Sequence, residues 1–391
     1  MGKNIVGFLL VFIISVSGLP VQVNATEDTT SIGIEAPHAV LMEASTGMIL
    51  YEKDAHVGVP PASVTKIMTM LLIFEALEEN KIKLEDMVTV SEKAASMGGS
   101  QVFLEPNEKQ TVDTMLKCIA VASANDACVA MAEFVSGSEE AFVNKMNERA
   151  KELGMKNTTF KNCNGLDEDG HVISAYDVAV MSRELLVNHP QVHEYCTIWM
   201  DTIVHHTAKG SQEFGLSNTN KLIKQYEYST GLKTGSTSEA GFCVSATAKK
   251  GDMELIAVIM NGENSKSRFL DATTLLNYGY ANYQIYLDTD AQRDILNAMT
   301  VKSGVETEVP LKYEKDFSFL LMNGESLTSI EKRLHLPKEL HAPVEINQIV
   351  GTLEYYHGHK KLGEINIIAD KFVDKAKYSD YVKRVWLAWM M

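Results

Sequence analysis

The stretch from Pro60 to Leu77 reads PPASVTKIMTMLLIFEAL. Two prolines precede Ser63 and good helix formers dominate the residues after it, so we expect a helix to begin near Ser63. Ser63 and Lys66 are three residues apart and therefore face the same side of that helix. A serine hydroxyl is a weak nucleophile until a base takes its proton, and a lysine can be that base when burial or nearby positive charge lowers its pKa. The stretch thus predicts a nucleophile at a helix start, where backbone N–H groups can stabilise an oxyanion.

Strand patterns flank this helical stretch on both sides. Residues 37–52 alternate between apolar and polar types around Ser45-Thr46-Gly47, which predicts a hairpin. Residues 111–188 are mostly of helical pattern, and two strand-like runs come after them at 241–248 and 253–261. The order of strands, helices and strands predicts an α/β (α+β) fold in which an antiparallel sheet carries a helical insertion.

The chain is long enough for more than one domain, and its character changes after Asn282. Short β-type runs separated by polar turns replace the helical pattern there, which predicts a small all-β domain. We therefore expect a main domain over residues 30–284, a β domain over residues 285–370 and a terminal helix within residues 371–391.

The composition of the 391-residue chain is that of a folded globular protein, with 45% apolar and 22% charged residues. Its formal charge of −15 excludes non-specific nucleic-acid binding through a basic surface. The five cysteines follow no metal-binding spacing, and no histidine pair has the His-Glu-x-x-His pattern of a zinc peptidase. We expect no metal and no other cofactor. Cys118, Cys128 and Cys243 lie in apolar stretches and are expected to be buried.

The first 25 residues have the pattern of a secretory signal peptide. Lys3 precedes an apolar run from Ile5 to Val16, and Val23-Asn24-Ala25 places small or aliphatic residues where a signal peptidase reads the chain. The alternative is an uncleaved membrane anchor, for which the apolar run is short. We expect cleavage after Ala25 and export of the protein.

The C-terminal segment, residues 371–391, has the pattern of a basic amphipathic helix. Its apolar and aromatic residues recur at helical spacing from Tyr378 to Met390 and include Trp386 and Trp389. The segment carries five basic and two acidic residues in a strongly acidic chain. Such a helix lies in an anionic membrane surface without spanning it, whereas the alternative is a helix packed on the protein body. We expect a peripheral anchor at the outer face of the cytoplasmic membrane.

Two further motifs distinguish Ser63 from a chance Ser-x-x-Lys pattern. A second such pattern runs from Ser329 to Lys332, and we interpret it as surface. Ser123-Ala124-Asn125 is the only Ser-x-Asn in the chain, and Lys233-Thr234-Gly235 is the only Lys-Thr-Gly. Closely similar motifs occur in this order in serine β-lactamases and penicillin-binding proteins.

Over nearly its whole length the chain resembles the low-molecular-mass penicillin-binding proteins, which form the serine-type D-alanyl-D-alanine carboxypeptidase family. The segments that carry the resemblance are Pro61–Thr69, Ser123–Cys128, Asn218–Leu222, Thr230–Gly235 and Ala342–Gly351. One departure is Asn162-Cys163-Asn164-Gly165-Leu166, where the family usually has Asn-Pro-His-Gly-Leu or a relative. The resemblance implies a β-lactamase/transpeptidase-like fold, a C-terminal β domain and acylation by β-lactam antibiotics.

The resemblance also implies catalytic roles in removing the terminal D-alanine from a peptidoglycan stem pentapeptide. Ser63 would attack the carbonyl between the last two D-alanines, and Lys66 would accept its proton. Ser123 would relay a proton to the departing amine. Asn125 would hold both Lys66 and the substrate amide.

Substrate-binding roles are implied for four residues of the second half of the main domain. Lys233 and Thr234 would attract the free terminal carboxylate, which an exopeptidase must recognise. The backbone N–H of Ser236 would complete the oxyanion hole with that of Ser63. Arg268 resembles a family arginine near the carboxylate pocket, and its alternative is a solvated surface charge.

Two other functions are compatible with these motifs. A β-lactamase-like hydrolase would need a residue for deacylation, and Glu184 has the Glu-x-x-x-Asn spacing of one. Because Glu184 lies in a regular helical pattern far along the chain from Ser123, we interpret it as helix surface and expect penicillin to leave Ser63 slowly. A non-catalytic penicillin-sensing wall protein is the second alternative, and the presence of every motif residue opposes it.

Overall fold

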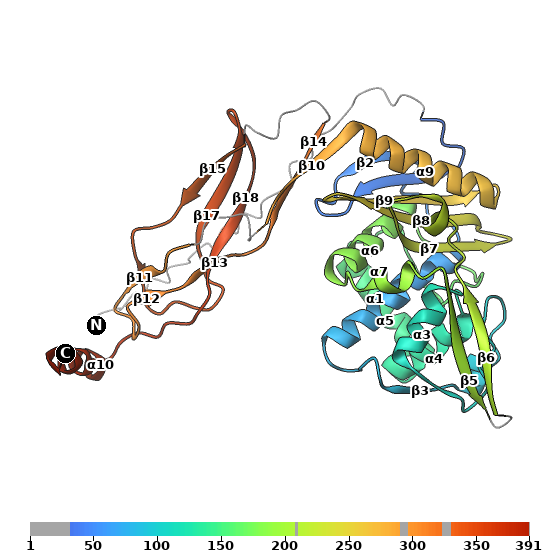
Figure 1. Ribbon diagram of the computed structural model, residues 1–391, viewed down its shortest axis with the longest axis horizontal. Coiled ribbons are helices and arrows are strands. Elements are labelled where there is room, and N and C mark those ends of the chain that lie inside the picture. The colour runs from blue at the N-terminus through green and yellow to red at the C-terminus, as the bar shows by residue number, and fades with distance from the viewer. Residues whose placement is uncertain (1–31, 208–209, 290–295, 323–329, 391) are drawn as a thin grey trace, which may run out of the picture. The chain divides into compact units, whose positions relative to one another are not determined.

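The computed structural model describes residues 32–207, 210–289, 296–322 and 330–390 (Figure 1). The signal peptide expected over residues 1–25 and Ser329 of the second Ser-x-x-Lys pattern lie outside the described residues.

A five-stranded antiparallel sheet forms one layer of the main domain, in the order β2-β1-β9-β8-β7. Its strands are β1 (His38–Glu43), β2 (Ile49–Lys53), β7 (Ser229–Thr237), β8 (Gly241–Lys250) and β9 (Met253–Gly262). The hairpin expected over residues 37–52 and the two later strands are thus confirmed. Helix α9 (Ser265–Asn282) packs on β8 and β9, and helix α6 (Ala175–Asn188) packs on β1, β8 and β9. Figure 1 shows α9 and α6 on opposite sides of the sheet, which explains why β8 and β9 are buried along most of their length.

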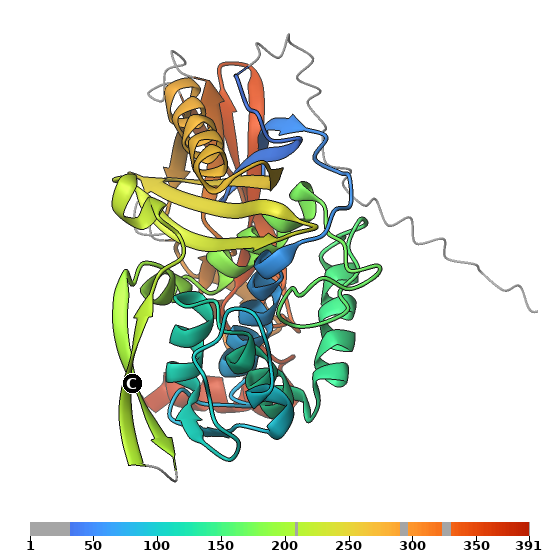
Figure 2. The same cartoon turned by 90° about the vertical axis from the view of Figure 1, so that its right-hand side faces the viewer.

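The helical insertion expected between the strands is confirmed, and α1 (Lys66–Glu78) lies at its centre. Most residues of α1 are buried, so this helix has no polar face and packs against neighbours all round. Around it lie α3 (Val112–Ala120), α4 (Asn125–Ser136), α5 (Glu139–Glu152), the short helices α2 (Glu92–Ala95) and α7 (Val192–Cys196), and the hairpin of β3 (Met87–Thr89) and β4 (Lys109–Thr111). A second hairpin, β5 (Met200–Thr207) with β6 (Gly210–Ser217), lies beside these helices, as Figure 2 shows.

The start of α1 differs from the expectation in one respect. Ser63 lies in a single 3-10 turn, η1 (Ala62–Thr65), and the α-helix begins at Lys66. In a 3-10 turn, residues three apart are eclipsed, so the tighter geometry places Lys66 directly over Ser63. The hydroxyl of Thr65 donates to the carbonyl of Ala62 at 2.9 Å and stabilises this turn.

The C-terminal β domain has its own sheets and its own cores. Its elements are β10 (Tyr283–Asp288) with β14 (Phe317–Met322); β12 (Glu308–Val309), β11 (Met299–Lys302) and β16 (Leu340–His341); and β13 (Leu311–Tyr313), β18 (Lys360–Ala369), β17 (Ile349–His357) and β15 (Ile330–His335). One core gathers around Val309, Val344 and Ile367, and another around Phe317 and Tyr355. The mixed helix and sheet fold with a separate β domain matches the sequence expectation.

The expected terminal helix is present as α10 (Tyr378–Met390), and every one of its residues is exposed or half-buried. The preceding chain is held to the β domain by a bridge between Lys375 and Gly304, and the Arg384 guanidinium donates to the carbonyls of Gly304 and Val305. Among the described residues, no helix is both long enough and apolar enough to cross a membrane.

Candidate active site

Ser63 and Lys66 are joined at the start of α1. The Lys66 ammonium nitrogen Nζ lies 2.9 Å from Ser63 Oγ, 2.7 Å from Asn125 Oδ1 and 2.6 Å from the carbonyl oxygen of Asn164. Lys66 is fully buried, and this burial lowers its pKa. A neutral amine has two N–H donors and one lone pair. When both donors serve the carbonyl oxygens of Asn125 and Asn164, the lone pair is directed at the Ser63 hydroxyl.

The Ser-x-Asn motif lies where α3 ends and α4 begins. Ser123 is almost fully buried and has a positive φ of 60°, an uncommon conformation for a residue with a side chain. Asn125 connects three elements: its Oδ1 accepts from Lys66, its Nδ2 donates to Gly98 O at 2.7 Å, and its backbone N–H donates to Ser100 O at 2.7 Å. The side-chain amide nitrogen of Asn125 is therefore directed at the 98–100 loop.

The Lys-Thr-Gly motif lies within β7. Lys233 is buried, and its Nζ donates to the carbonyl of Thr234 at 3.1 Å. Burial and repulsion from Lys66 lower the pKa of Lys233 to about 7. The hydroxyls of Thr234 and Thr219 are 2.7 Å apart, which ties β7 to the Asn218–Leu222 segment.

Glycines allow two segments to approach the nucleophile closely. A Cβ on Gly235 would lie 2.8 Å from the backbone nitrogen of Ser63, so only glycine lets β7 pass this near. A Cβ on Gly165 would lie 1.9 Å from Ala62 O, and Gly165 also has φ +89°. Both glycines therefore bring backbone against the 3-10 turn that carries Ser63.

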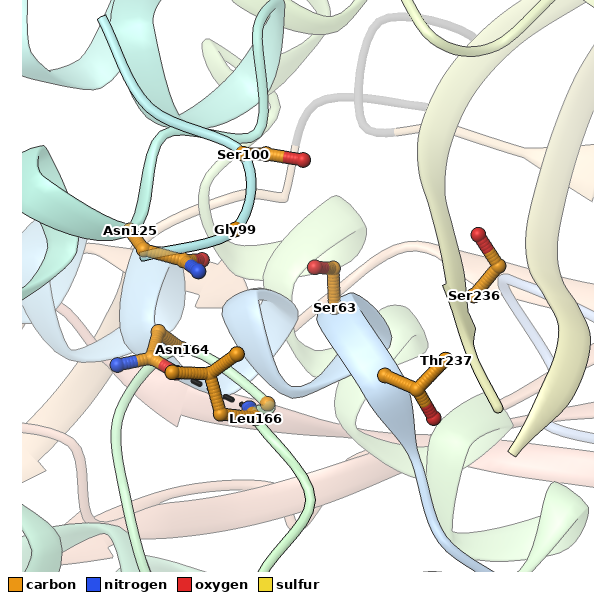
Figure 3. A pocket seen from close by; sticks show the side chains of 9 residues that line it. Ser63, Gly99, Ser100, Asn125, Asn164, Leu166, Ser236 and Thr237 are labelled. Atoms are coloured by element: carbon orange, nitrogen blue, oxygen red, sulfur yellow. Dashed lines mark hydrogen bonds between the residues drawn. The ribbon is translucent and has the colours of Figure 1, made fainter. Parts of the chain in front are cut away.

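A pocket of about 420 Å³ opens beside Ser63. Its lining residues are Ser63, Gly99, Ser100, Asn125, Asn164, Gly165, Leu166, Ser236 and Thr237. In Figure 3, Ser63 lies between Asn125 and Ser100 on one side and Ser236 and Thr237 of β7 on the other. The pocket is thus bounded by Ser63 and Asn125 of the first two motifs, by the two residues that follow the Lys-Thr-Gly motif in β7 and by the 162–166 loop.

The structure brings most of the expected site residues together. Ser63, Asn125 and Ser236 line the pocket, Lys66 is bonded to Ser63 and Asn125, and Lys233 and Thr234 precede Ser236 in β7. Ser123 lies two residues before Asn125 at the start of α4.

Arg268 is buried, which excludes the solvated surface charge that was its alternative. Its guanidinium donates to the carbonyls of Gly235 at 2.9 Å and Cys243 at 3.1 Å and packs on the ring of Phe269. Burial lowers the pKa of Arg268 to about 10. In this structure the side chain holds β7 to β8, and Arg268 is not among the described residues that line the pocket.

Sequence reasoning missed the contribution of the 162–166 loop. Asn164 reaches Lys66 through its backbone carbonyl, and the neighbouring Cys163 carbonyl accepts from Thr69 Oγ1 at 2.5 Å. Any residue type offers a backbone carbonyl, so no side-chain motif could have indicated this role. The only signal was that the segment departs from the family pattern.

Glu184 and the cysteines are placed away from this chemistry. Glu184 lies in α6 and forms an ion pair with Arg149 at 2.6 Å. All five cysteines are buried, as expected for Cys118, Cys128 and Cys243. Within the described ranges, no group of three histidine, cysteine or acidic side chains could hold a metal ion.

Comparisons with known proteins give consistent matches over most of the chain. Residues 22–264 match the family model described as D-alanyl-D-alanine carboxypeptidase, and residues 291–375 match that of the penicillin-binding protein 5 C-terminal domain. The chain is 44% identical over 361 residues to D-alanyl-D-alanine carboxypeptidase DacF of Bacillus subtilis, covering 92% of each chain. It is 31% identical to DacA of Escherichia coli, covering 91% of this chain and 89% of that one. The structure of penicillin-binding protein 5 from Haemophilus influenzae superposes with a TM-score of 0.70 at 30% identity, over 88% of this chain and 98% of that one.

Proposed function

The chain belongs to the D-alanyl-D-alanine carboxypeptidase family, and on that premise we propose that Ser63 is the nucleophile with which it removes the terminal D-alanine from peptidoglycan stem peptides. The observation that carries this assignment is the 2.9 Å separation of Lys66 Nζ from Ser63 Oγ, next to a pocket that Ser63, Asn125 and Ser236 line. The membership itself makes the protein a serine carboxypeptidase of the penicillin-sensitive type.

Acylation would proceed as a proton transfer coupled to attack. Neutral Lys66 takes the proton of Ser63 as Oγ bonds to the carbonyl carbon between the two D-alanines. The developing oxyanion is bound by the backbone N–H groups of Ser63 and Ser236. The carbon–nitrogen bond then breaks, and the proton held by Lys66 passes through the Ser123 hydroxyl to the departing D-alanine amine.

Binding of the chain end would depend on positive charge in β7. Lys233, assisted by the Thr234 hydroxyl, attracts the free carboxylate that distinguishes a terminal D-alanine from an internal residue. Burial keeps the pKa of Lys66 low, which favours the neutral base. The Arg268 guanidinium supports the carbonyl of Gly235 and so maintains the strand beside Ser63.

Deacylation by water would use the same base. Water replaces D-alanine in the pocket, loses a proton to Lys66 and bonds to the acyl carbon. The bond from that carbon to Ser63 Oγ then breaks, Oγ takes the proton back from Lys66, and the shortened peptide is released. Glu184 of α6 is hydrogen-bonded to Arg149 of α5. This contact supports the interpretation of Glu184 as a structural residue and disfavours a β-lactamase-like second function. A β-lactam would therefore acylate Ser63 and remain bound for long periods.

The deciding assay measures released D-alanine from a pentapeptide that ends in D-Ala-D-Ala. Wild type should release D-alanine and gain the mass of one penicillin, and Ser63→Ala should do neither. Ser96→Ala is the matched control, because that exposed hydroxyl bonds only to a carbonyl of its own helix among the described contacts. D-Alanine release by Ser63→Ala at the wild-type rate would refute the nucleophile assignment.

We further propose that the exported protein is held at the outer face of the cytoplasmic membrane by α10. Tyr378, Trp386 and Trp389 are 85%, 65% and 91% exposed, so the apolar face of the helix is uncovered. Lys383 and Arg384 place positive charge in this helix although the chain has a net charge of −15, and basic residues beside an uncovered apolar face favour binding to anionic lipid. Deletion of residues 378–391 should abolish sedimentation with anionic vesicles and leave D-alanine release unchanged; continued sedimentation would refute the anchor.

A further inference from the structure

Phe103 lies close to the pocket in a conformation that few bulky residues adopt. It follows the pocket-lining Ser100 by three residues, has φ +63° and is 61% exposed. A positive φ at a large side chain costs free energy and persists only where surrounding contacts impose it. The structure therefore holds an aromatic ring in solvent at the edge of the site.

The contacts that impose this conformation come from α4, the helix that begins at Asn125 of the Ser-x-Asn motif. Asp126, fully buried at the start of α4, accepts hydrogen bonds from the backbone N–H groups of Val102 and Leu104, each at 3.1 Å from Oδ2. These two residues flank Phe103, so one carboxylate fixes the backbone on both sides of it. Asn125, the neighbour of Asp126, holds Ser100 through its backbone N–H. The position of the Phe103 ring is thus tied directly to the Ser-x-Asn motif.

A second aromatic ring extends this surface on the β5–β6 hairpin. The rings of Phe103 and Phe214 are 5.8 Å apart and meet edge to face at 68°. The hairpin is docked there by His205, whose Nδ1 lies 2.8 Å from the buried carboxylate of Glu108, and by Gln110, whose amide donates to Val204 O. Figure 2 shows the hairpin running beside the helices that carry the site. We call Phe103 and Phe214 the aromatic shelf.

Phe103 lies close enough to the pocket to be reached by the far end of a bound stem peptide. Three residues of chain span at most about 11 Å, so Phe103 lies within that reach of Ser100. A stem peptide bound with its scissile carbonyl at Ser63 extends about 13 Å over the four residues that precede the cut. The group beyond those residues is the sugar to which the stem is attached.

The chemistry of the shelf suits a sugar ring. The free carboxylates of the stem gain little from an aromatic face, whereas a stem ammonium can pack on one, and that occupant would make Phe103→Ala lose activity equally with and without the sugar attached. A pyranose ring presents an apolar C–H face that packs on aromatic rings, and the N-acetylated sugars of the glycan are uncharged and so are not repelled by an acidic protein. We propose that the aromatic shelf binds a sugar ring of the glycan strand that bears the stem peptide. This inference rests on the proposed function, which supplies the substrate.

The test compares two substrates of the full-length chain: an acetylated pentapeptide ending in D-Ala-D-Ala, and the same pentapeptide attached to its disaccharide. Wild type should cleave the disaccharide-linked substrate with a kcat/KM about fivefold higher, because packing against an aromatic ring contributes a factor of that order. Phe103→Ala should lose this preference and retain the wild-type kcat/KM for the free pentapeptide. Phe103→Trp should keep the preference, as should Phe372→Ala, which removes an exposed phenylalanine from the β domain.

The outcomes distinguish a failure of the sugar-binding proposal from a failure of the proposed function. Equal losses on both substrates in Phe103→Ala, an unchanged preference, or no preference in wild type would each overturn the sugar assignment. Weaker vesicle binding by Phe103→Ala with an unchanged preference would identify the shelf as a membrane contact and also overturn it. If wild type cleaved neither substrate, the proposed function would fail, and binding of the free disaccharide to wild type and Phe103→Ala, measured by NMR titration, would decide the shelf independently.

Discussion

The pocket beside Ser63 and helix α10 invert the usual distribution of polar and apolar side chains in opposite ways. Around Ser63, two lysines are buried together. In α10, two tryptophans and a tyrosine are exposed. Both arrangements cost free energy in the isolated protein, the first by desolvating charge and the second by hydrating apolar surface. On the proposed function, each cost is offset when a partner binds, a carboxylate in the pocket and a lipid surface at the helix.

The two regions also differ in how tightly their parts are bound to the rest of the chain. Lys66 makes contacts with three segments that are far apart in sequence, so the site exists only in the folded domain. The side chains of α10 form their apolar face from local helical spacing alone. Substitutions in the pocket should therefore change chemistry and stability together, whereas substitutions in α10 should change membrane affinity alone.

The largest effect is expected from Lys66→Ala. Removing the general base should slow acylation of Ser63 by penicillin by about 10²–10⁴-fold, because that is the usual contribution of a positioned base. Stopped-flow measurement of adduct formation checks this. Lys151→Ala, at the exposed end of α5, is the matched control and should acylate at the wild-type rate. A loss below tenfold would mean that another group removes the proton.

The next largest effect is expected from Lys233→Met, which should raise the free energy of unfolding and lower the activity. The pKa of Lys233 is lowered to about 7 in the folded chain, against about 10.4 in the unfolded chain. Between these values the unfolded chain binds more protons, so this residue makes the free energy of unfolding rise with pH from 7 to 10. Lys233→Met should remove that slope and stabilise the protein at pH 7 by up to about 4 kcal/mol, while D-alanine release falls.

Denaturant unfolding of wild type and Lys233→Met at pH 7 and pH 9.5 checks this prediction. The stability difference between the two proteins should shrink at the higher pH, because wild-type Lys233 is then neutral in the folded state. Lys151→Met provides the control, since its exposed side chain should leave the slope unchanged. A variant less stable than wild type at both pH values would show that Lys233 is paired with a charge rather than strained by burial.

Sequence motifs could predict the site residues that contribute a side chain, but not those that contribute only a backbone atom. The roles proposed for Ser63, Lys66 and Lys233 belong to side chains with distinctive types and spacing, so the motifs located these residues. Asn164 acts through a carbonyl, which every residue possesses. Arg268 could be located, but its contacts with Gly235 and Cys243 depend on how α9 crosses the sheet, and local sequence does not encode that crossing.

The fold shows the same division. The sheet, the helical insertion and α10 follow from local periodicity, and all three were predicted. The 3-10 turn at Ser63 was not, because its geometry depends on β7 and the 162–166 loop pressing against it through Gly235 and Gly165. The sheet order and the docking of the β5–β6 hairpin likewise depend on long-range pairing that no local pattern contains.

A smaller effect is expected from Trp389→Ala in α10. The side chain is 91% exposed, so nearly its whole apolar surface is available to lipid. Losing about 2 kcal/mol of burial should weaken binding to anionic vesicles by about thirtyfold, without a change in the melting temperature. Met322→Ala, which removes an exposed apolar side chain of β14, should bind vesicles as wild type does. Equal vesicle binding by Trp389→Ala and wild type would show that the apolar face of α10 contacts something other than lipid.

The smallest effect is expected from Lys383→Ala, which tests how much the charged face of α10 contributes to vesicle binding. Lys383 and Arg384 are adjacent, but Arg384 is bonded to the carbonyls of Gly304 and Val305, so Lys383 is the better probe of lipid charge. Lys383→Ala should weaken binding to anionic vesicles by about fivefold, since one basic residue near an anionic surface contributes about 1 kcal/mol. The loss should disappear on neutral vesicles and at high salt, where the surface potential is screened, whereas the loss from Trp389→Ala should persist in both. If Lys383→Ala weakened binding equally on neutral vesicles, the helix would be held by apolar burial alone, and charge would have no part in selecting the membrane.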